Sequence, residues 1–224
     1  MSAAATMRQT MLAETRVFGP PKLALADEIG GAIRNRPPPM QQSMRSPHSS
    51  MDTSVWVNRF LPLIKPGGLV LDLAAGRGRH VRLLRERGFP VCAIDRDVTA
   101  LLAYAGPCCE VRQIDLETDE RRPLGGDYDG IIVTNYLHRP LLSAIACALA
   151  PGGVLIYETF ARGNERFGRP RNPDLLLRPG ELLEAFTALS VVAFEQGEVS
   201  VPSPAVIQRL AAVLGPMGRL PQAG

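Results

Sequence analysis

Short apolar runs alternate with amphipathic stretches along the chain from about residue 52 onward. Five of these runs have the length and composition of buried strands and lie at 69–73, 90–95, 110–116, 129–135 and 154–158. The segments between them predict helices over 53–61 with Asp52 as cap, after the glycines at 76 and 78, over 138–150, and from 178 to 186. Strands that alternate with helices predict a parallel sheet, and two last runs at 190–195 and 205–213 predict an antiparallel pair at its edge.

The first predicted strand runs into an acidic residue and a turn of small residues. Asp72 precedes Ala74, Gly76 and Gly78, and a helix is expected to follow. Glycine lets the backbone approach a ligand closely and adopt dihedral angles that are closed to other residues. The free N–H groups of the helix point toward whatever lies over the turn. A carboxylate at this place favours a ligand with a cationic or hydroxyl group.

A dinucleotide site is the obvious alternative for such a turn. Its G-x-G-x-x-G/A pattern needs a third small residue for close packing of helix on strand, and this chain has Val81 there. The carboxylate of Asp72 would also repel a pyrophosphate. A ligand with an ammonium group and no phosphate, such as S-adenosylmethionine (SAM), fits the turn better than a nicotinamide dinucleotide.

Further acidic residues stand where the second and third strands are expected to end. Asp95 lies about twenty residues beyond the turn, where an acid accepts hydrogen bonds from ribose hydroxyls, and Arg96 is expected beside the adenine edge. Asp115, next to Leu116, could accept from the adenine amino group or be a solvated loop acid. Because ligands of open α/β sheets bind outside the carboxyl ends of the strands, we expect Asp72, Asp95 and Asp115 to converge on one crevice.

Three motifs carry a resemblance to a known family. The segment around Asp72 resembles motif I of the class I SAM-dependent methyltransferases, D/E-x-G-x-G-x-G, with Ala74 where the first glycine is commonest. The stretches TNYLHRP at 134–140 and YETFxxGNExxGRPxNPxxLLRPGELL from residue 157 onward are similar to small methyltransferases often labelled tellurite-resistance-like. The resemblance spans about 56–213.

This resemblance implies a Rossmann-like α/β sandwich with a mostly parallel central sheet, an antiparallel closing strand and helices on both faces. It implies SAM as the cofactor, S-adenosylhomocysteine (SAH) as the product, and transfer of a methyl group to a small-molecule acceptor that the motifs do not identify. The residues expected to bind the cofactor are Asp72, Ala74, Gly76, Gly78, Asp95, Arg96, Asp115, Leu116 and Asn135.

Candidate catalytic residues follow the fourth predicted strand. The cofactor sulfonium is already an activated methyl donor, so the protein must mainly align the reacting atoms and exclude water. A general base is needed only if the acceptor loses a proton. His138 is the best candidate because histidine titrates near neutral pH, although it could instead cap or pack a helix start. Asn135 could orient an acceptor or tie down the loop, and Tyr136, Tyr157 and Glu158 are further candidates by position.

A long loop at 159–178 is expected to leave the fifth strand where an acceptor would enter, since loops of this length in compact domains are usually functional or disordered. Its arginines could receive an anionic acceptor through bidentate contacts or simply be solvated. They are Arg162, Arg166, Arg169 and Arg171.

Two other classes of function stay open. A nucleic-acid or protein methyltransferase is the second, but amino methylation of DNA bases typically uses Asn/Asp-Pro-Pro-aromatic, and Asn135-Tyr136-Leu137 lacks both prolines. The net charge of +3 also gives little attraction for nucleic acid. A non-catalytic SAM-binding protein is the third, although it would not need the three strand-end acids. The oligomeric state is left open.

Composition limits the location of the protein. No apolar run approaches the roughly 18 residues that span a bilayer, so membrane insertion is not expected. The four cysteines lack CxxC or Cys/His spacing, which argues against a metal site, and Cys92 and Cys147 lie in apolar runs and are expected in the core. We therefore expect a reducing, cytoplasmic location and no metal.

The pattern divides the chain into three parts. Residues 1–50 are rich in Pro, Ser, Gln and Met without periodicity, which predicts a disordered or weakly ordered extension, with Met51 as an alternative translation start. Acidic residues at 14, 27 and 28 weaken a transit-peptide interpretation. The methyltransferase domain is expected at 51–215, followed by a flexible tail at 216–224.

Overall fold

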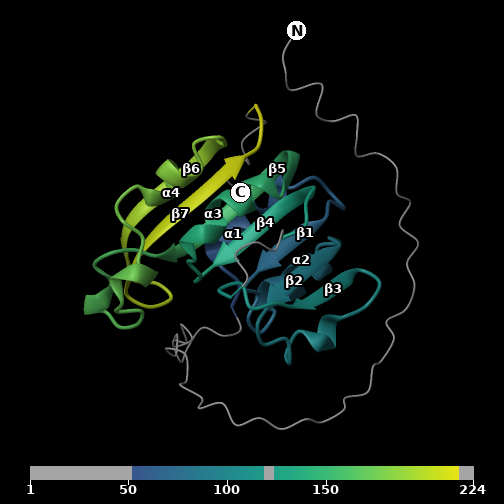
Figure 1. Ribbon diagram of the computed structural model, residues 1–224, viewed down its shortest axis with the longest axis horizontal. Helices are drawn as coiled ribbons and strands as arrows, with labels where there is room; N and C mark the ends of the chain where they lie inside the picture. The colour runs from purple at the N-terminus through teal and green to yellow at the C-terminus, as the bar shows by residue number, and fades with distance from the viewer. Residues whose placement is uncertain (1–51, 119–123, 217–224) are drawn as a thin grey trace, which may run out of the picture. The chain divides into compact units, whose positions relative to one another are not determined.

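A seven-stranded sheet runs through the computed structural model (Figure 1), which describes residues 52–118 and 124–216. Within these residues the strand order is β3-β2-β1-β4-β5-β7-β6. Strands β1 to β5 are parallel, and β7 runs antiparallel to both β5 and β6, which confirms the predicted architecture. The bounds are β1 Val70–Leu73, β2 Val91–Asp95, β3 Cys109–Gln113, β4 Tyr128–Thr134, β5 Leu149–Phe160, β6 Ser190–Val199 and β7 Ala205–Val213.

Two parts of the predicted domain division cannot be compared with this structure. The extension predicted at 1–50 and nearly all of the tail predicted at 216–224 lie outside the described residues, so both stay predictions.

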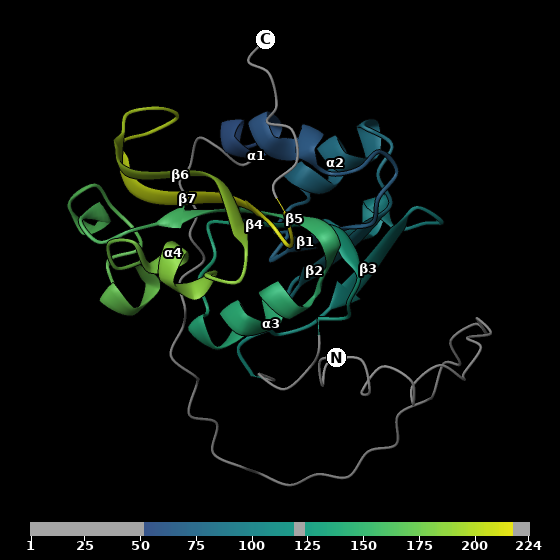
Figure 2. The same ribbon diagram turned by 90° about the horizontal axis from the view of Figure 1, so that it is seen from above.

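Helices cover both faces of the sheet, as expected. Figure 2 shows α1 (Val55–Phe60) and α2 (Arg79–Glu86) on one side, and α3 (Leu142–Cys147) and α4 (Glu181–Ala185) on the other. The segment Arg139–Leu141 forms a 3₁₀ turn, η4, directly before α3. None of the helices within 52–118 and 124–216 is both long and apolar enough to span a bilayer.

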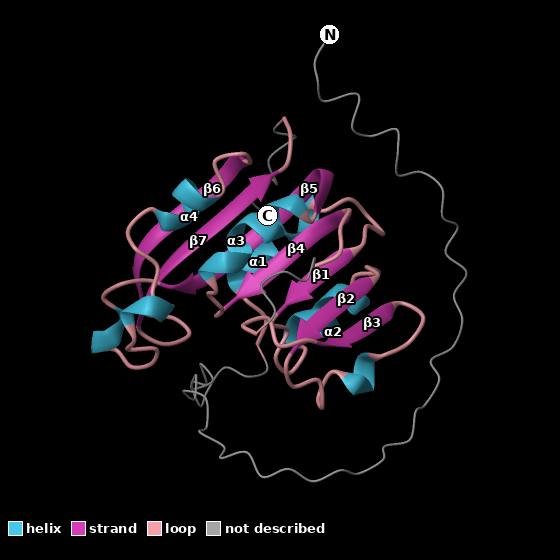
Figure 3. Ribbon diagram, viewed as in Figure 1, coloured by secondary structure: helices cyan, strands magenta, loops and turns pink. Residues whose placement is uncertain are grey.

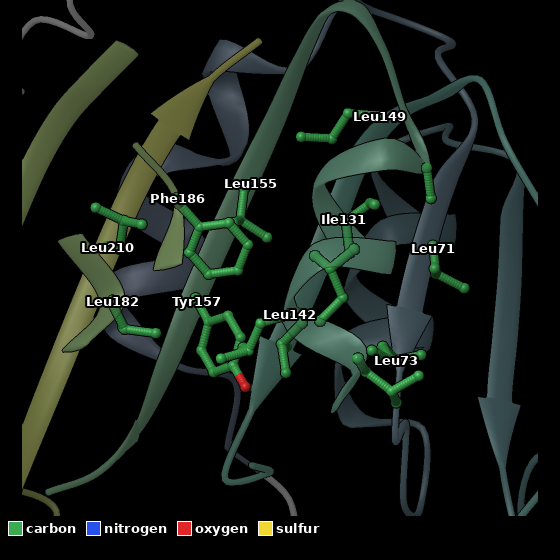
Figure 4. Packing of buried hydrophobic residues seen from close by; sticks show 14 of the residues in the cluster. Leu71, Leu73, Ile131, Leu142, Leu149, Leu155, Tyr157, Leu182, Phe186 and Leu210 are labelled. Atoms are coloured by element: carbon green, nitrogen blue, oxygen red, sulfur yellow. The ribbon is translucent and has the colours of Figure 1, made fainter. Parts of the chain in front are cut away.

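Two hydrophobic clusters flank the sheet because successive side chains of a strand point to opposite faces. Leu71 and Leu73 of β1 join the cluster under α3 and α4, which Figure 4 shows together with Tyr157. Val70 joins the cluster under α1 and α2, with Trp56. Each fully buried large aliphatic side chain contributes about 1.5–3 kcal/mol relative to an exposed one. The central strands are therefore held firmly in register, and their ends with them.

The first, third and fourth predicted helices differ from the structure at their ends. The fourth, predicted from residue 178, begins at Glu181 because Gly180 before it has a left-handed backbone conformation. Helix α1 is capped by Ser54, whose Oγ accepts from the Val57 N–H at 3.2 Å, and Asp52 lies before the cap. The helix predicted over 138–150 contains η4 and the short α3 instead. Its predicted end belongs to β5, because Leu149 pairs with Tyr128 across the sheet.

Three strand ends and one cysteine also correct the predictions. Strand β6, predicted at 190–195, continues to Val199 because its pairing with β7 extends to Ala205. Strand β5 continues through the Pro-Gly-Gly segment at 151–153 instead of beginning after it. Strand β3 ends at Gln113, because the Asp115 carboxylate turns the chain by accepting from the Glu117 N–H at 3.0 Å. Cys147, expected in the core, is exposed at the end of α3, whereas Cys92 is buried.

Close packing at Gly130 of β4 can be tested by adding one methyl group. A Cβ at Gly130 would lie 2.3 Å from Cδ1 of Ile64, so Gly130→Ala should lower the free energy of unfolding by about 1–3 kcal/mol through overpacking. Adding Ile64→Val removes that methyl and should restore part of the loss in urea denaturation. Gly126→Ala, which meets no atom within 4 Å, is the matched control. A Gly130→Ala variant as stable as this control would contradict the packing.

Candidate active site

The strands β1, β2, β3 and β4 end at one edge of the sheet, called here the carboxyl edge. Their register puts Leu73 level with Ile94 and Val133, and Asp95 level with Gln113. Figure 3 shows the arrowheads of β1, β2 and β4 pointing to the same side. The last residues of these strands and the segments that follow them carry the residues expected to bind the cofactor, so the fold brings those residues to one edge.

The turn after β1 depends on left-handed backbone conformations. Ala74, Gly76 and Gly78 have φ angles of 55°, 58° and 79°. A Cβ at Gly78 would lie 2.7 Å from Cε2 of Tyr104, whereas one at Gly76 would meet nothing within 4 Å. Ala74 tolerates a conformation that costs a non-glycine residue roughly 1–2 kcal/mol, which explains why glycine is commoner in this place. The turn thus has an open side at Gly76.

Asp95 pins this turn to β2. Its Oδ2 accepts from the Gly76 N–H at 2.7 Å, and its Oδ1 accepts from the Asp97 N–H at 3.0 Å. The Ala75 N–H donates to the Ile94 carbonyl at 3.0 Å. Since a carboxylate offers about four lone pairs, Asp95 keeps capacity to accept from a ligand.

Asp72 is a buried carboxyl group in β1, one residue before the strand ends. The residue is only 1% exposed, and its Oδ2 has no hydrogen-bond partner among the described residues. Burial raises its pKa to about 7, against the attraction of the Arg79 guanidinium and with a contribution from Asp95. A buried acceptor without a donor is unfavourable, so this position suits a ligand that brings a cationic donor.

Arg79 is a further candidate site residue, which the sequence motifs did not indicate. Its Nη1 donates to the Asp52 carbonyl at 3.0 Å and its Nη2 to Thr134 Oγ1 at 3.4 Å. Burial lowers its pKa, while the negative charges of Glu158, Asp72 and Asp52 raise it. The sequence contained one signal for Arg79. It begins the helix after the glycine turn, and because the helix dipole disfavours a cation there, nearby acidic residues are expected.

His80 beside it ties the segment before α1 to the start of α2. Its buried Nε2 accepts from the Ser54 N–H at 3.1 Å, which requires the neutral ring. Burial lowers the pKa of His80 to about 3, and Arg79 lowers it further. This histidine is therefore a structural acceptor and not a proton carrier near neutral pH.

The remaining cofactor candidates lie along the same edge with different exposure. The Gln113 Nε2 donates to the Arg96 carbonyl at 3.1 Å, which holds the segment after β2 against β3. Asp115 is exposed and Leu116 is buried among the residues that pack under α3. Because the Leu116 side chain is in the core, only its backbone is available to a ligand.

The segment after β4 brings three further candidates to the edge. Asn135 has a φ of 54°, and its N–H donates to the Glu158 carbonyl at 2.9 Å. The Tyr136 hydroxyl is buried without a hydrogen-bond partner among the described residues. Burial raises the Tyr136 pKa well above its usual range, and Glu117, Asp115 and Asp95 contribute, in that order. His138 lies near Glu117. Burial raises the pKa of Glu117, and His138 opposes that shift.

Two other base candidates are engaged in structural contacts. The buried Tyr157 hydroxyl donates to the Tyr136 carbonyl at 2.9 Å, and burial raises its pKa well above the usual range. Glu158 Oε2 accepts from Arg209 Nε at 2.6 Å. Neither group is therefore well placed to act as a base.

The loop arginines divide into two kinds. Arg166 lies over the Phe167 ring of the loop and pairs with Glu198 of β6, so it joins the loop to that strand. Arg162, Arg169 and Arg171 are exposed. In the part of the chain that the structure describes, no three His, Cys, Asp or Glu side chains group closely enough to hold a metal ion.

A parallel sheet with this strand order, a glycine turn after β1 and acids at the strand ends together define a class I SAM-dependent methyltransferase. A family model described as a methyltransferase domain matches residues 52–210. The chain belongs to this methyltransferase domain family. A search of curated protein sequences gave no match.

Three solved structures illustrate the similarity of fold. TehB from Haemophilus influenzae is 16% identical with a TM-score of 0.57 over 70% of this chain, which spans 60% of TehB. A TehB-like SAM-dependent methyltransferase from Corynebacterium glutamicum is 20% identical with a TM-score of 0.51, covering 70% of this chain and 85% of that one. The 1,6-didemethyltoxoflavin-N1-methyltransferase of Burkholderia thailandensis, solved with 1,6-didemethyltoxoflavin and SAH, is 19% identical with a TM-score of 0.53, covering 72% and 76%.

Replacing Asp72 should reveal the cost of its buried charge. Its pKa is raised from 3.8 to about 7, so the folded state binds a proton that the unfolded state has lost, and this group lowers stability as pH rises through that range. Asp72→Asn should therefore match the wild type below about pH 4 and exceed it above about pH 7, by on the order of 4 kcal/mol at most.

Chemical denaturation of the ligand-free protein at several pH values measures this difference. His80 is present in both proteins, so its own pH dependence cancels. Asp127→Asn, the same substitution at an exposed carboxylate, is the control. A difference between Asp72→Asn and wild type that does not grow with pH would contradict the buried, uncompensated carboxyl.

Proposed function

We propose that this protein transfers the methyl group of SAM to a small-molecule acceptor at the carboxyl edge. The observation that carries the proposal is the buried, unmatched Oδ2 of Asp72, which lies close enough to the Arg79 guanidinium for its charge to act on the carboxyl group. The amino-acid part of SAM has one ammonium and one carboxylate group. A carboxylate and a guanidinium beside an open glycine turn match it in charge, with Asp72 facing the ammonium and Arg79 the carboxylate.

The nucleoside part of the cofactor would extend from Gly76 toward β3. Asp95 accepts from the ribose hydroxyls, and Arg96 lies beside the adenine edge. Asp115 and the backbone of Leu116 take the adenine amino group and ring nitrogen. The hydrogen bond from Gly76 to Asp95 supports this arrangement, because the carboxylate holds the turn at the glycine whose added Cβ would meet no atom within 4 Å.

The chemistry follows from the position of Asn135, Tyr136 and His138. Bound SAM supplies a methyl group that is already activated by the sulfonium. With SAM bound, an acceptor lone pair would form the new bond to carbon as the carbon–sulfur bond breaks and its electron pair stays on sulfur. Tyr136 stays protonated, so it donates a hydrogen bond and orients the acceptor. If the acceptor carries a proton, His138 is the group that receives it. Asn135 lines the junction between cofactor and acceptor.

A small-molecule acceptor is favoured over nucleic acid or protein. The net charge of +3 is low for nucleic-acid binding. Among proteins of similar fold, one is named for methylation of the small molecule 1,6-didemethyltoxoflavin. We also propose that residues 51–215 form the catalytic domain, and that the protein works in the cytoplasm, where its four free cysteines stay reduced.

The function can be tested by calorimetric titration with SAH, SAM and NADH in parallel. We expect micromolar binding of the two adenosyl ligands and none of NADH. Labelled SAM is then offered with small thiols, phenols, amines and carboxylic acids, and separately with transfer RNA and protein extract. No adenosyl binding by a folded sample would contradict the proposal. Binding without transfer to any of these would favour a non-catalytic SAM-binding protein.

Asp95 provides a residue-level test of the same site. Asp95→Ala should weaken SAH binding at least tenfold, because hydrogen bonds to a charged group contribute about 1.5–3 kcal/mol. Asp95→Asn keeps one acceptor oxygen and should lose less. Glu86→Ala, an exposed carboxylate at the far end of α2, is the control. Unchanged SAH affinity in Asp95→Ala, with the fold intact by thermal melting, would remove Asp95 from the cofactor site.

A further inference from the structure

The two motifs that distinguish this chain meet through one ion pair. Arg139 lies in TNYLHRP after β4, and Glu181 lies in LLRPGELL at the start of α4. Arg139 Nε donates to Glu181 Oε1 at 2.6 Å, and Nη2 donates to Oε2 at 3.0 Å. The Glu181 side chain is only 5% exposed. This is a two-bond fork between a guanidinium and a carboxylate, which fixes orientation as well as distance.

The same guanidinium also holds the loop that follows β5. Nη1 of Arg139 donates to the Asp174 carbonyl, and Nη2 donates to the Leu176 carbonyl at 2.9 Å. The loop is closed at its base, where the Arg162 N–H donates to the Leu177 carbonyl at 2.9 Å. Arg139 therefore contacts α4 and also the second half of the loop formed by residues 161–177.

Segment 135–138, which precedes Arg139 and carries the candidate catalytic residues, is held by a second contact. The Tyr157 hydroxyl, which points away from Phe186 in Figure 4, donates to the Tyr136 carbonyl at 2.9 Å. Tyr157 is also close enough to both Arg139 and Glu181 for their charges to act on it. Segment 135–138 is thus held by Tyr157 at Tyr136 and by Arg139 at its end.

The energetic state of Glu181 supports a strong and specific contact. Burial opposes its ionisation, yet the hydrogen bonds from Arg139 and from the Arg178 N–H outweigh burial, so its pKa lies below the usual value. By contrast, the pair of Arg166 with Glu198 on the same loop has both side chains more than half exposed and joins the loop to β6. Only the first of these two pairs connects the loop to the segment after β4.

We propose that Arg139 and Glu181 are positioning residues for the methyl acceptor. By joining segment 135–138 to loop 161–177, the pair fixes the two segments that flank the proposed acceptor. Among the described residues, its side-chain hydrogen bonds involve none of those proposed to bind the cofactor. The inference rests on the proposed function, because it assumes that the acceptor lies next to Tyr136. Neither residue touches the reacting atoms, and each acts through the backbone that carries Tyr136 and His138.

The test is ¹⁹F NMR of the full chain labelled with 3-fluorotyrosine, with the Tyr136 resonance assigned through Tyr136→Phe. The variants are Glu181→Gln, Arg139→Ala and Arg139→Lys, with Arg166→Ala as the control that breaks the exposed pair on the same loop. Glu181→Gln is the decisive variant, because it keeps the side-chain shape and is 45 positions from Tyr136 in the sequence. SAH affinity and trypsin cleavage after Arg162 and Arg171 are measured on the same samples.

We expect Glu181→Gln and Arg139→Ala to shift or broaden the Tyr136 resonance and to speed loop cleavage at least tenfold. SAH affinity should change less than twofold, Arg139→Lys should recover part of the Tyr136 signal, and Arg166→Ala should resemble the wild type. Faster cleavage with an unchanged Tyr136 resonance would overturn the proposal, because the pair would then only stabilise the loop. If the wild type fails to bind SAH, the proposed function fails, while the Tyr136 signal of the unliganded protein still tests the coupling.

Discussion

The register of the parallel strands is the constraint on which the rest of this structure depends. Strand β1 pairs with β2 and β4 so that Leu73, Ile94 and Val133 stand level. Apolar side chains on both faces hold this alignment, since a slip of one residue would turn every side chain of a strand to the opposite face. The core thus positions the candidate site. Because the strand ends are fixed relative to one another, so are the turn at Gly76, the carboxylate of Asp95 and the segment at Asn135.

Strands and strand-end acids could be predicted from the sequence because their signals are local. An apolar run followed by a carboxylate identifies the ends of β1 and β2 without knowledge of any partner. The early end of β3 and the continuation of β5 through 151–153 were not predictable in this way. They depend on the turn at Asp115 and on pairing of Leu149 with Tyr128, which are contacts that only the folded chain defines.

The same distinction applies to the site. Asp72 was predicted from its place before the glycine turn and Asp95 from its place at the end of the next apolar run. By contrast, the charge of Arg79 is stabilised in part by Glu158, which lies 79 positions away in the sequence. No sequence pattern indicated a role for His80. Its buried contact with Ser54 in the structure makes it a structural hydrogen-bond acceptor. Tyr157 and Glu158 were candidate bases by position, but their bonds to Tyr136 and Arg209 assign them to the framework. A residue whose role depends on partners far away in the sequence can be interpreted only once the fold is known.

The burial of Asp72 has a consequence for the thermodynamics of ligand binding. With a pKa of about 7, this carboxyl group is partly protonated at neutral pH while the site is empty. A ligand that brings an ammonium group favours the ionised form, so binding displaces the proton and exchanges one cation for another. The heat of binding near pH 7 then includes the ionisation heat of whichever buffer takes up that proton. If SAM binds with its ammonium group at Asp72, as proposed, its affinity rises with pH until Asp72 has lost its proton in the free protein, so a dissociation constant must be given together with the pH.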